Sequence, residues 1–331
     1  MAAPGDPTIA AKVQSGRALR PVHGKPVVVA SGLEKHFTLG GGIIASLLGN
    51  PGRVVKAVDG VDITINEGEV FGLVGESGSG KSTLGMTLVR LLRATAGTIR
   101  FQGRDVTDVS GGALKQYRRD AQIIFQDPYG SLNPRLTVGQ LIEEPLRIHG
   151  VRDKAERAVH VVEALERVLM PPAEYLHRFP HELSGGQRQR IAIARAIVLE
   201  PEFIVADEPV SMLDVSVQAG VLDLLERLSR ELRLAVLYVS HDIATVRYIC
   251  DRVAVMYLGK FVEYGDARAV TAEPIHPYTK RLMAAVPSVD PTVKRKRVEM
   301  LGDWSTDGVC DHDGPHWKEV GPNHYVACHL H

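Results

Sequence analysis

A glycine-rich turn between an apolar run and a helical pattern constrains the fold of this chain more than any other feature. The turn spans residues 75–83 and matches the pattern G-x-x-x-x-G-K-[S/T]. The apolar run 70–74 precedes it, and leucines follow it at helical spacing, at positions 84, 88, 91 and 92. A strand, a glycine turn and a helix N-terminus in this order direct backbone N–H groups at a polyphosphate. The sequence therefore predicts a nucleotide-binding loop behind a buried parallel strand.

Two side chains of this loop have distinct expected roles. Lys81 is expected to reach the β- and γ-phosphates, and the hydroxyl of Ser82 is expected to ligate Mg²⁺. Glycines at three loop positions permit a close approach that a Cβ would block. The residues expected to surround the nucleotide are Gly75, Glu76, Ser77, Gly78, Ser79, Gly80, Lys81, Ser82 and Thr83.

Charge and hydropathy exclude several other classes of protein. Among the 331 residues, 39 Lys and Arg balance 39 Asp and Glu, so the overall charge does not favour a nucleic-acid partner. No apolar run approaches the roughly 18–20 residues that span a bilayer. The N-terminus lacks the apolar core of a signal peptide. We therefore expect a cytosolic chain that reaches a membrane through a partner.

Strand and helix patterns alternate along most of the chain, which predicts an α/β fold with a mostly parallel sheet. A helical stretch between about residues 127 and 190 interrupts this alternation and is expected to form an inserted subdomain. Expected strands lie at 27–30, 54–65, 70–74, 97–103, 203–206, 234–239 and 253–257, and expected helices lie at 221–228 and 243–250.

Two adjacent acids end the apolar strand pattern 203–206. Because the strand's carboxyl end should lie beside the nucleotide loop, Asp207 is expected to hold Mg²⁺, directly or through water. Glu208 is expected to orient and deprotonate an attacking water. The plainer alternative is a pair of solvated acids after a strand.

A third motif makes a family resemblance specific. The segment 183–190, Leu-Ser-Gly-Gly-Gln-Arg-Gln-Arg, resembles the signature motif of ABC-transporter ATPase subunits. The signature motif of those subunits also lies between a helical stretch and an acidic strand end, as this segment lies between the helical stretch and Asp207. The resemblance implies a P-loop ABC-type nucleotide-binding domain with an antiparallel β lobe, and ATP as the nucleotide. It further implies that ATP lies between the loop of one subunit and the signature of a facing subunit, here Ser184, Gly185, Gly186 and Gln187.

Further family motifs match single residues. Gln126 resembles the glutamine that contacts Mg²⁺ and the attacking water, and His241 resembles the switch histidine that contacts the γ-phosphate. Phe37 stands where the family's adenine-stacking aromatic stands. A satisfied histidine at a strand end and a buried core phenylalanine are the alternatives.

Two other stretches resemble the oligopeptide/dipeptide/nickel importer branch. They are residues 127–138 and 274–282. This resemblance implies an ATP-hydrolysing subunit that powers peptide import through two membrane permease subunits, peripheral on the cytoplasmic face of the membrane. It also implies a second ABC ATPase subunit, identical or different, and an extracytoplasmic substrate-binding protein. Residues 126–145 are the expected permease contact. Oligosaccharide or nickel cargo, or a non-transport ABC ATPase, are the alternatives.

The expected organisation is an N-terminal tail at 1–26, an ABC ATPase domain at 27–270 and a C-terminal extension at 271–331. Residues 38–53 are expected to form a glycine-rich surface insert. Relatives in this branch often carry four cysteines for an iron–sulfur cluster. Here only Cys310 and Cys328 stand in the tail, so no such cluster is expected. We expect a locally folded tail without metal, with a Cys/His zinc site as the alternative.

Overall fold

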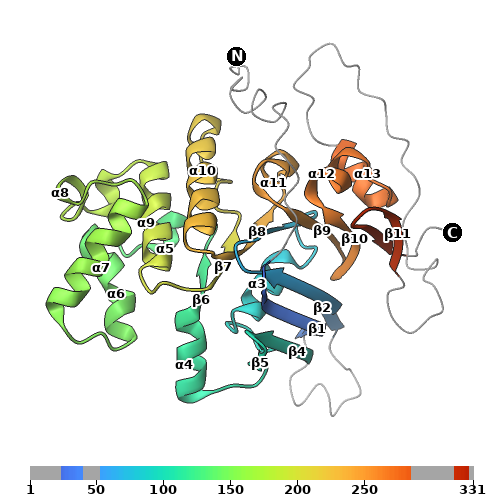
Figure 1. The fold of residues 1–331 in the computed structure, drawn as a ribbon, viewed down its shortest axis with the longest axis horizontal. Coiled ribbons are helices and arrows are strands. Elements are labelled where there is room, and N and C mark those ends of the chain that lie inside the picture. Colours follow the sequence, from blue (N-terminus) through green and yellow to red (C-terminus); the bar gives the residue numbers. More distant parts are fainter. Residues whose placement is uncertain (1–23, 40–52, 285–316, 328–331) are drawn as a thin grey trace.

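The computed structural model of this chain contains two β-sheets, helices that pack near them and a separate group of helices (Figure 1). The structure describes residues 24–39, 53–284 and 317–327. Its strands are β1 (Pro26–Leu39), β2 (Arg53–Asn66), β3 (Val70–Val74), β4 (Ala96–Phe101), β5 (Arg104–Asp105), β6 (Ala121–Ile124), β7 (Phe203–Asp207), β8 (Ala235–Ser240), β9 (Arg252–Tyr257), β10 (Lys260–Asp266), β11 (Trp317–Gly321) and β12 (His324–Ala327). Its helices are α3 (Lys81–Leu88), α4 (Gly111–Asp120), α5 (Pro128–Ser131), α6 (Val138–Ile148), α7 (Lys154–Arg167), α8 (Pro172–Tyr175), the 3₁₀ turn η1 (Pro180–Glu182), α9 (Gly185–Ile197), α10 (Val215–Glu231), α11 (Ile243–Ile249), α12 (Ala267–Ala272) and α13 (Pro277–Ala284).

The larger sheet has the strand order β11-β12-β10-β9-β3-β8-β7-β6. Its five strands from β9 to β6 are parallel, and β10, β12 and β11 extend one edge antiparallel. Every residue of β3, β7 and β8 is buried, which explains why these strands are almost uninterrupted apolar runs. The predicted mostly parallel core is confirmed.

Alternate residues of the buried strands face two different cores, because successive side chains of a strand point to opposite faces. On β7, Phe203 and Val205 pack with Leu84 and Leu88 of α3. Ile204 belongs to the other core, which includes residues of α6, α7, α9, α10 and α11. The phosphate-loop helix α3 is thereby fixed on one face of the sheet.

The smaller sheet has the order β2-β1-β4-β5, and its pairings are antiparallel. It confirms the antiparallel lobe that the family resemblance implies. Two of its strands are longer than expected: β1 continues to Leu39, and β2 runs from Arg53 to Asn66. Among the buried residues of this lobe, Val28, Leu33 and Ile65 share a core with α3.

Helices α5 to α9 form a group at one end of the molecule, drawn in green and yellow (Figure 1). Leu141 and Ile142 of α6, Leu165 of α7 and Ile191 of α9 form its buried centre. The group runs from 128 to 197, so α9 extends past the expected limit at 190. The domain boundaries remain a proposal.

The C-terminal part differs most from expectation. The hairpin β11–β12 pairs with β10 and continues the larger sheet, so this part of the tail is not a separate local fold. Cys310 and Cys328, most of the N-terminal tail and residues 40–52 of the insert lie outside the described residues. Within the described ranges, no helix is both long and apolar enough to cross a membrane.

Candidate functional site

The glycine-rich turn joins β3 to α3, as the sequence predicts. Gly80 caps α3 in the left-handed backbone region, with φ of 109°. A Cβ on Gly80 would lie 1.9 Å from the carbonyl oxygen of Ala57, so only glycine allows the loop to rest against β2. The loop is therefore fixed between the two sheets.

Lys81 folds back over its own loop. Its Nζ donates hydrogen bonds to the carbonyl oxygens of Gly75 at 2.8 Å and Glu76 at 2.7 Å. Burial lowers the pKa of Lys81, while the negative charges of Glu208, Asp207 and Glu76 act in the opposite direction. The ammonium group thus lies over the loop that would hold a polyphosphate.

Ser82 and Asp207 meet at the carboxyl end of β7. The Ser82 hydroxyl donates a hydrogen bond to Asp207 Oδ1 at 3.0 Å. Burial raises the pKa of Asp207, and the hydrogen bond from Ser82 opposes this effect. A hydroxyl beside a buried carboxylate is an oxygen pair of the kind Mg²⁺ prefers. These two predicted metal ligands therefore fit the ion. Gln126, the third predicted ligand, lines the same pocket as Ser82, and its role at the metal stays a prediction.

Glu208 is the centre of a second group of polar side chains. Its carboxylate accepts a hydrogen bond from Gln126 Nε2 at 2.7 Å, and its Oε1 lies 3.0 Å from Nδ1 of His241. Its backbone φ is +47°, an unusual value for a residue other than glycine that recurs at functional sites. Three predicted catalytic residues from three separate loops are thus brought together.

These groups line one open pocket of about 540 Å³. Six residues of the phosphate loop and the start of α3 line it together with Gln126, Glu208 and His241; the six are Ser77, Gly78, Gly80, Lys81, Ser82 and Thr83. The volume is in the range that accommodates a small-molecule ligand. Ala57, from β2, also lines the pocket, and Ser211 Oγ lies 3.4 Å from Gln126 Nε2. Sequence patterns did not single out Ala57, because a small side chain that lines a wall carries no motif.

The signature segment lies elsewhere. Ser184 caps α9, accepting a hydrogen bond from the Gln187 N–H, and the Gln187 side chain bonds back to the Ser184 N–H. None of its residues lines the pocket. A Cβ on Gly186 would lie 2.3 Å from Cγ1 of Val217, so this glycine permits the close contact between α9 and α10. The family resemblance places Gly186 at the ATP of a facing subunit, and this packing contact is a second role that the sequence did not predict.

Phe37 is on β1 and pairs with Val55 of β2. Ala57, which lines the pocket, is two residues further along β2. Its ring carries the ammonium group of Lys35 at 5.0 Å from the centroid. Phe37 does not line the pocket described above. Its stacking role stays a prediction.

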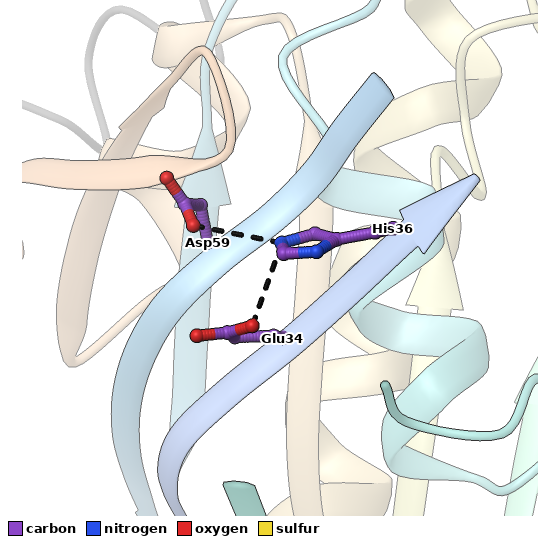
Figure 2. Close-up of side chains that lie close together, drawn as sticks. All are labelled: Glu34, His36 and Asp59. Atoms are coloured by element: carbon purple, nitrogen blue, oxygen red, sulfur yellow. Dashed lines mark ion pairs between the residues drawn. The ribbon is translucent and has the colours of Figure 1, made fainter. Parts of the chain in front are cut away.

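A cluster outside the pocket also has the composition of a metal site. Figure 2 shows His36 of β1 between the carboxylates of Glu34 and Asp59, with His36 Nε2 at 3.6 Å and 3.5 Å from them. Lys56 and Lys260 also pair with Asp59, at 3.3 Å and 3.4 Å. Burial raises the pKa of Asp59, but the two lysines outweigh burial, and the net pKa is lowered. Since two ammonium groups already neutralise Asp59, the cluster is an ion-pair network.

Comparisons with known proteins agree with this geometry. Residues 58–211 match the ABC transporter family, and residues 262–304 match the oligopeptide/dipeptide transporter C-terminal region. The oligopeptide transport ATP-binding protein AppF of Bacillus subtilis is 44% identical over 90% of this chain and 95% of its own length. The glutathione import ATP-binding protein GsiA of Salmonella paratyphi A is 48% identical over 92% of this chain but 49% of its own length.

A solved structure shares the fold. The dimeric, post-hydrolysis structure of the ATP-binding cassette MJ0796, bound to ADP and Pi, has a TM-score of 0.63 and 29% identity, and the match covers 73% of this chain and 99% of that one. The chain belongs to the ATP-binding subunits of ABC transporters, in the branch with the oligopeptide/dipeptide C-terminal region.

Proposed function

We propose that this ATPase subunit powers the import of peptides through a pair of membrane permease subunits. The observation that carries the proposal is that Gln126, Glu208 and His241 contact one another and line one pocket together with the phosphate loop. The C-terminal region and the likeness to AppF, whose name is that of an oligopeptide transport protein, favour peptides as cargo.

In this proposal the loop holds the phosphates of ATP. Backbone N–H groups at the start of α3 face them, and the ammonium group of Lys81 neutralises their charge. Ser82 and Asp207 hold Mg²⁺, which would stabilise charge on the phosphates. Because burial raises the pKa of Asp207, a cation beside its carboxylate relieves an unfavourable buried charge.

Glu208 is the proposed base. Its carboxylate accepts a proton from the attacking water while the Gln126 amide and the His241 ring fix its orientation. Both contacts lie at hydrogen-bond distance, so two neighbouring side chains hold the carboxylate in place. His241 lines the same pocket as the phosphate loop, and it is the proposed contact to the γ-phosphate.

The other half of the site comes from a facing subunit. Ser184 to Gln187 lie outside the pocket of their own chain, which supports a role at the ATP of a partner. MJ0796, a structure of the same fold, is dimeric with ADP and Pi. ATP would join two such subunits and hydrolysis would release them, as a ligand-controlled two-state switch. The second subunit is either a copy of this chain or a related ATPase, and Phe37 would stack on the adenine.

Residues 126–145 are the proposed permease contact. A pocket of about 230 Å³ lies beside them, lined by Phe125, Leu132, Pro145 and Ile148 among others. Phe125 and Ile148 are 42% and 57% exposed, which is unusual for large apolar side chains grouped at one site. The permeases, a substrate-binding protein outside the membrane and a peripheral position on the cytoplasmic face complete the proposed assembly.

The test uses the transporter reconstituted in vesicles with its permeases, its partner ATPase and its binding protein. Lys81→Ala should abolish peptide uptake and peptide-stimulated ATP hydrolysis, while peptide binding to the binding protein stays unchanged. Lys115→Ala, an exposed lysine of α4, is the matched control and should transport normally. Uptake at the wild-type rate by Lys81→Ala would sink the proposal. Stimulation by nickel or an oligosaccharide instead of peptides would refute the cargo.

A further inference from the structure

The C-terminal region makes a direct contact with the phosphate loop. The backbone N–H of Glu76, the second residue of the loop, donates a hydrogen bond of 2.8 Å to the hydroxyl oxygen of Tyr278 on α13. The carbonyl oxygen of the same residue accepts the 2.7 Å hydrogen bond from Lys81 Nζ. One loop residue is thus held at its N–H by the C-terminal region and at its C=O by the phosphate-binding lysine.

Tyr278 is itself firmly placed. Its side chain is 3% exposed, and its ring lies 4.4 Å from the ring of Tyr257 at the end of β9. Its backbone N–H donates to Nδ1 of His276. Burial raises the pKa of Tyr278 to about 12, so the hydroxyl keeps its proton throughout the physiological pH range.

A buried carboxylate fixes the segment that carries Tyr278. Glu263 of β10 is fully buried, and its two oxygens accept hydrogen bonds from the N–H groups of Ile275 and His276, both at 2.9 Å. The ring of His324 on β12 lies 2.6 Å from the same carboxylate. The entry to α13 and the C-terminal hairpin are therefore attached to one point of the sheet.

A second contact between α13 and the loop is weaker. Arg281 forms an ion pair with the Glu76 carboxylate at 2.8 Å, but both side chains are 50% exposed. Exposed pairs of this kind contribute little to stability because solvent screens them. The part-buried hydrogen bond from the Glu76 backbone N–H to the buried Tyr278 hydroxyl is less accessible to solvent and contributes more. Tyr278 is thus the main link.

We propose that Tyr278 is a positioning residue for ATP: by holding the Glu76 backbone it sets where Lys81 meets the phosphates, and it makes nucleotide affinity depend on the C-terminal region. This inference rests on the proposed role of Lys81 in ATP binding. It assigns a contact role to the segment 274–282, which the sequence singled out only as a family resemblance.

The experiment compares Tyr278→Phe with the wild-type full-length chain. The variant keeps the ring against Tyr257 and removes only the hydroxyl. Titration with a fluorescent ATP analogue and Mg²⁺ should show affinity reduced by about three- to tenfold, the range of one hydrogen bond. At saturating ATP, hydrolysis by the assembled transporter should stay within about twofold of wild type, because uniform binding is what is lost.

Two controls separate this effect from general damage. Tyr325→Phe removes a hydroxyl from the C-terminal hairpin, where its ring stacks on Tyr264, and should leave affinity unchanged. Arg281→Ala should weaken binding by less than about twofold, as expected for an exposed pair. Amide hydrogen exchange supplies a second readout: the peptide containing Glu76 should exchange faster in Tyr278→Phe.

The outcomes are distinguishable. Wild-type ATP affinity and wild-type exchange at Glu76 in Tyr278→Phe would overturn the inference. If Lys81→Ala also bound ATP normally, the proposed role of the phosphate loop would fail instead. Loss of binding in Lys81→Ala with intact binding in Tyr278→Phe would refute the positioning role alone.

Discussion

Glu263 offers the sharpest stability prediction, because one fully buried carboxylate serves three donors. Glu263→Ala removes the acceptor for the N–H groups of Ile275 and His276 and for the ring of His324. Each orphaned buried donor costs about 1–3 kcal/mol, so the three together cost roughly 3–9 kcal/mol if nothing moved. This is comparable to the whole stability of a domain, about 5–15 kcal/mol.

The hairpin should therefore detach from β10 rather than keep unsatisfied donors buried, since edge elements open at lower free energy than the core. Only the His324 ring lies on the hairpin, and losing its contact, at about 1–3 kcal/mol, corresponds to amide exchange at residues 317–327 that is faster by roughly 5- to 150-fold. Hydrogen exchange followed by mass spectrometry measures this directly. Glu263→Gln, which keeps one oxygen acceptor, should give an intermediate effect.

The matched control is Glu319→Ala. Glu319 is an exposed residue of β11, so its loss should change stability by no more than about 0.5 kcal/mol. If Glu263→Ala showed wild-type exchange rates across the hairpin, the buried carboxylate would not be what attaches the hairpin to β10, and this prediction would be refuted.

Three further predictions concern the nucleotide site. Burial raises the pKa of Asp207, so the native state binds this proton more tightly than the unfolded chain does, and stability is lost as the pH rises through the native pKa. Without nucleotide, Asp207→Asn should therefore have a higher melting temperature than wild type at pH 7. Calorimetry should show that this difference shrinks toward pH 4. Gly186→Ala should leave ATP binding unchanged but slow hydrolysis at least about tenfold, because the added Cβ would overlap the Val217 side chain. The double variant Gly186→Ala with Val217→Ala should recover the rate of hydrolysis. A double variant as slow as the single one would contradict the packing argument. Gly80→Ala should lose ATP binding in equilibrium titrations, since its Cβ would overlap the Ala57 carbonyl; normal affinity would show that the loop adapts.

The strands and loops that carry the chemistry were predictable because their signals are local. The apolar run before Gly75 and the run that ends at Asp207 are fully buried strands, as expected. Three predicted catalytic side chains, Gln126, Glu208 and His241, meet in one pocket. Their convergence follows from parallel strands ending at a common edge.

The features that sequence reasoning missed depend on distant partners. β12 pairs with β10 across some sixty residues, and no local pattern states that a tail hairpin will join a sheet edge. The contact between Tyr278 and Glu76 spans 202 positions. β6 escaped notice because Gln122 interrupts a run of only four residues. Phe37 differs from these cases because the family resemblance predicts that it stacks on adenine. The described pocket does not include Phe37, so this role stays a prediction.

Glu208 is the proposed base that activates water for ATP hydrolysis beside the phosphate loop. The most direct measurement is the steady-state ATP hydrolysis of Glu208→Gln in the assembled transporter, with Glu202→Gln at the other end of β7 as the control. We predict that Glu208→Gln still binds ATP but hydrolyses it at least about a hundredfold more slowly, the contribution expected of a general base, while the control stays normal. Hydrolysis by Glu208→Gln at the wild-type rate would show that Glu208 is not the base.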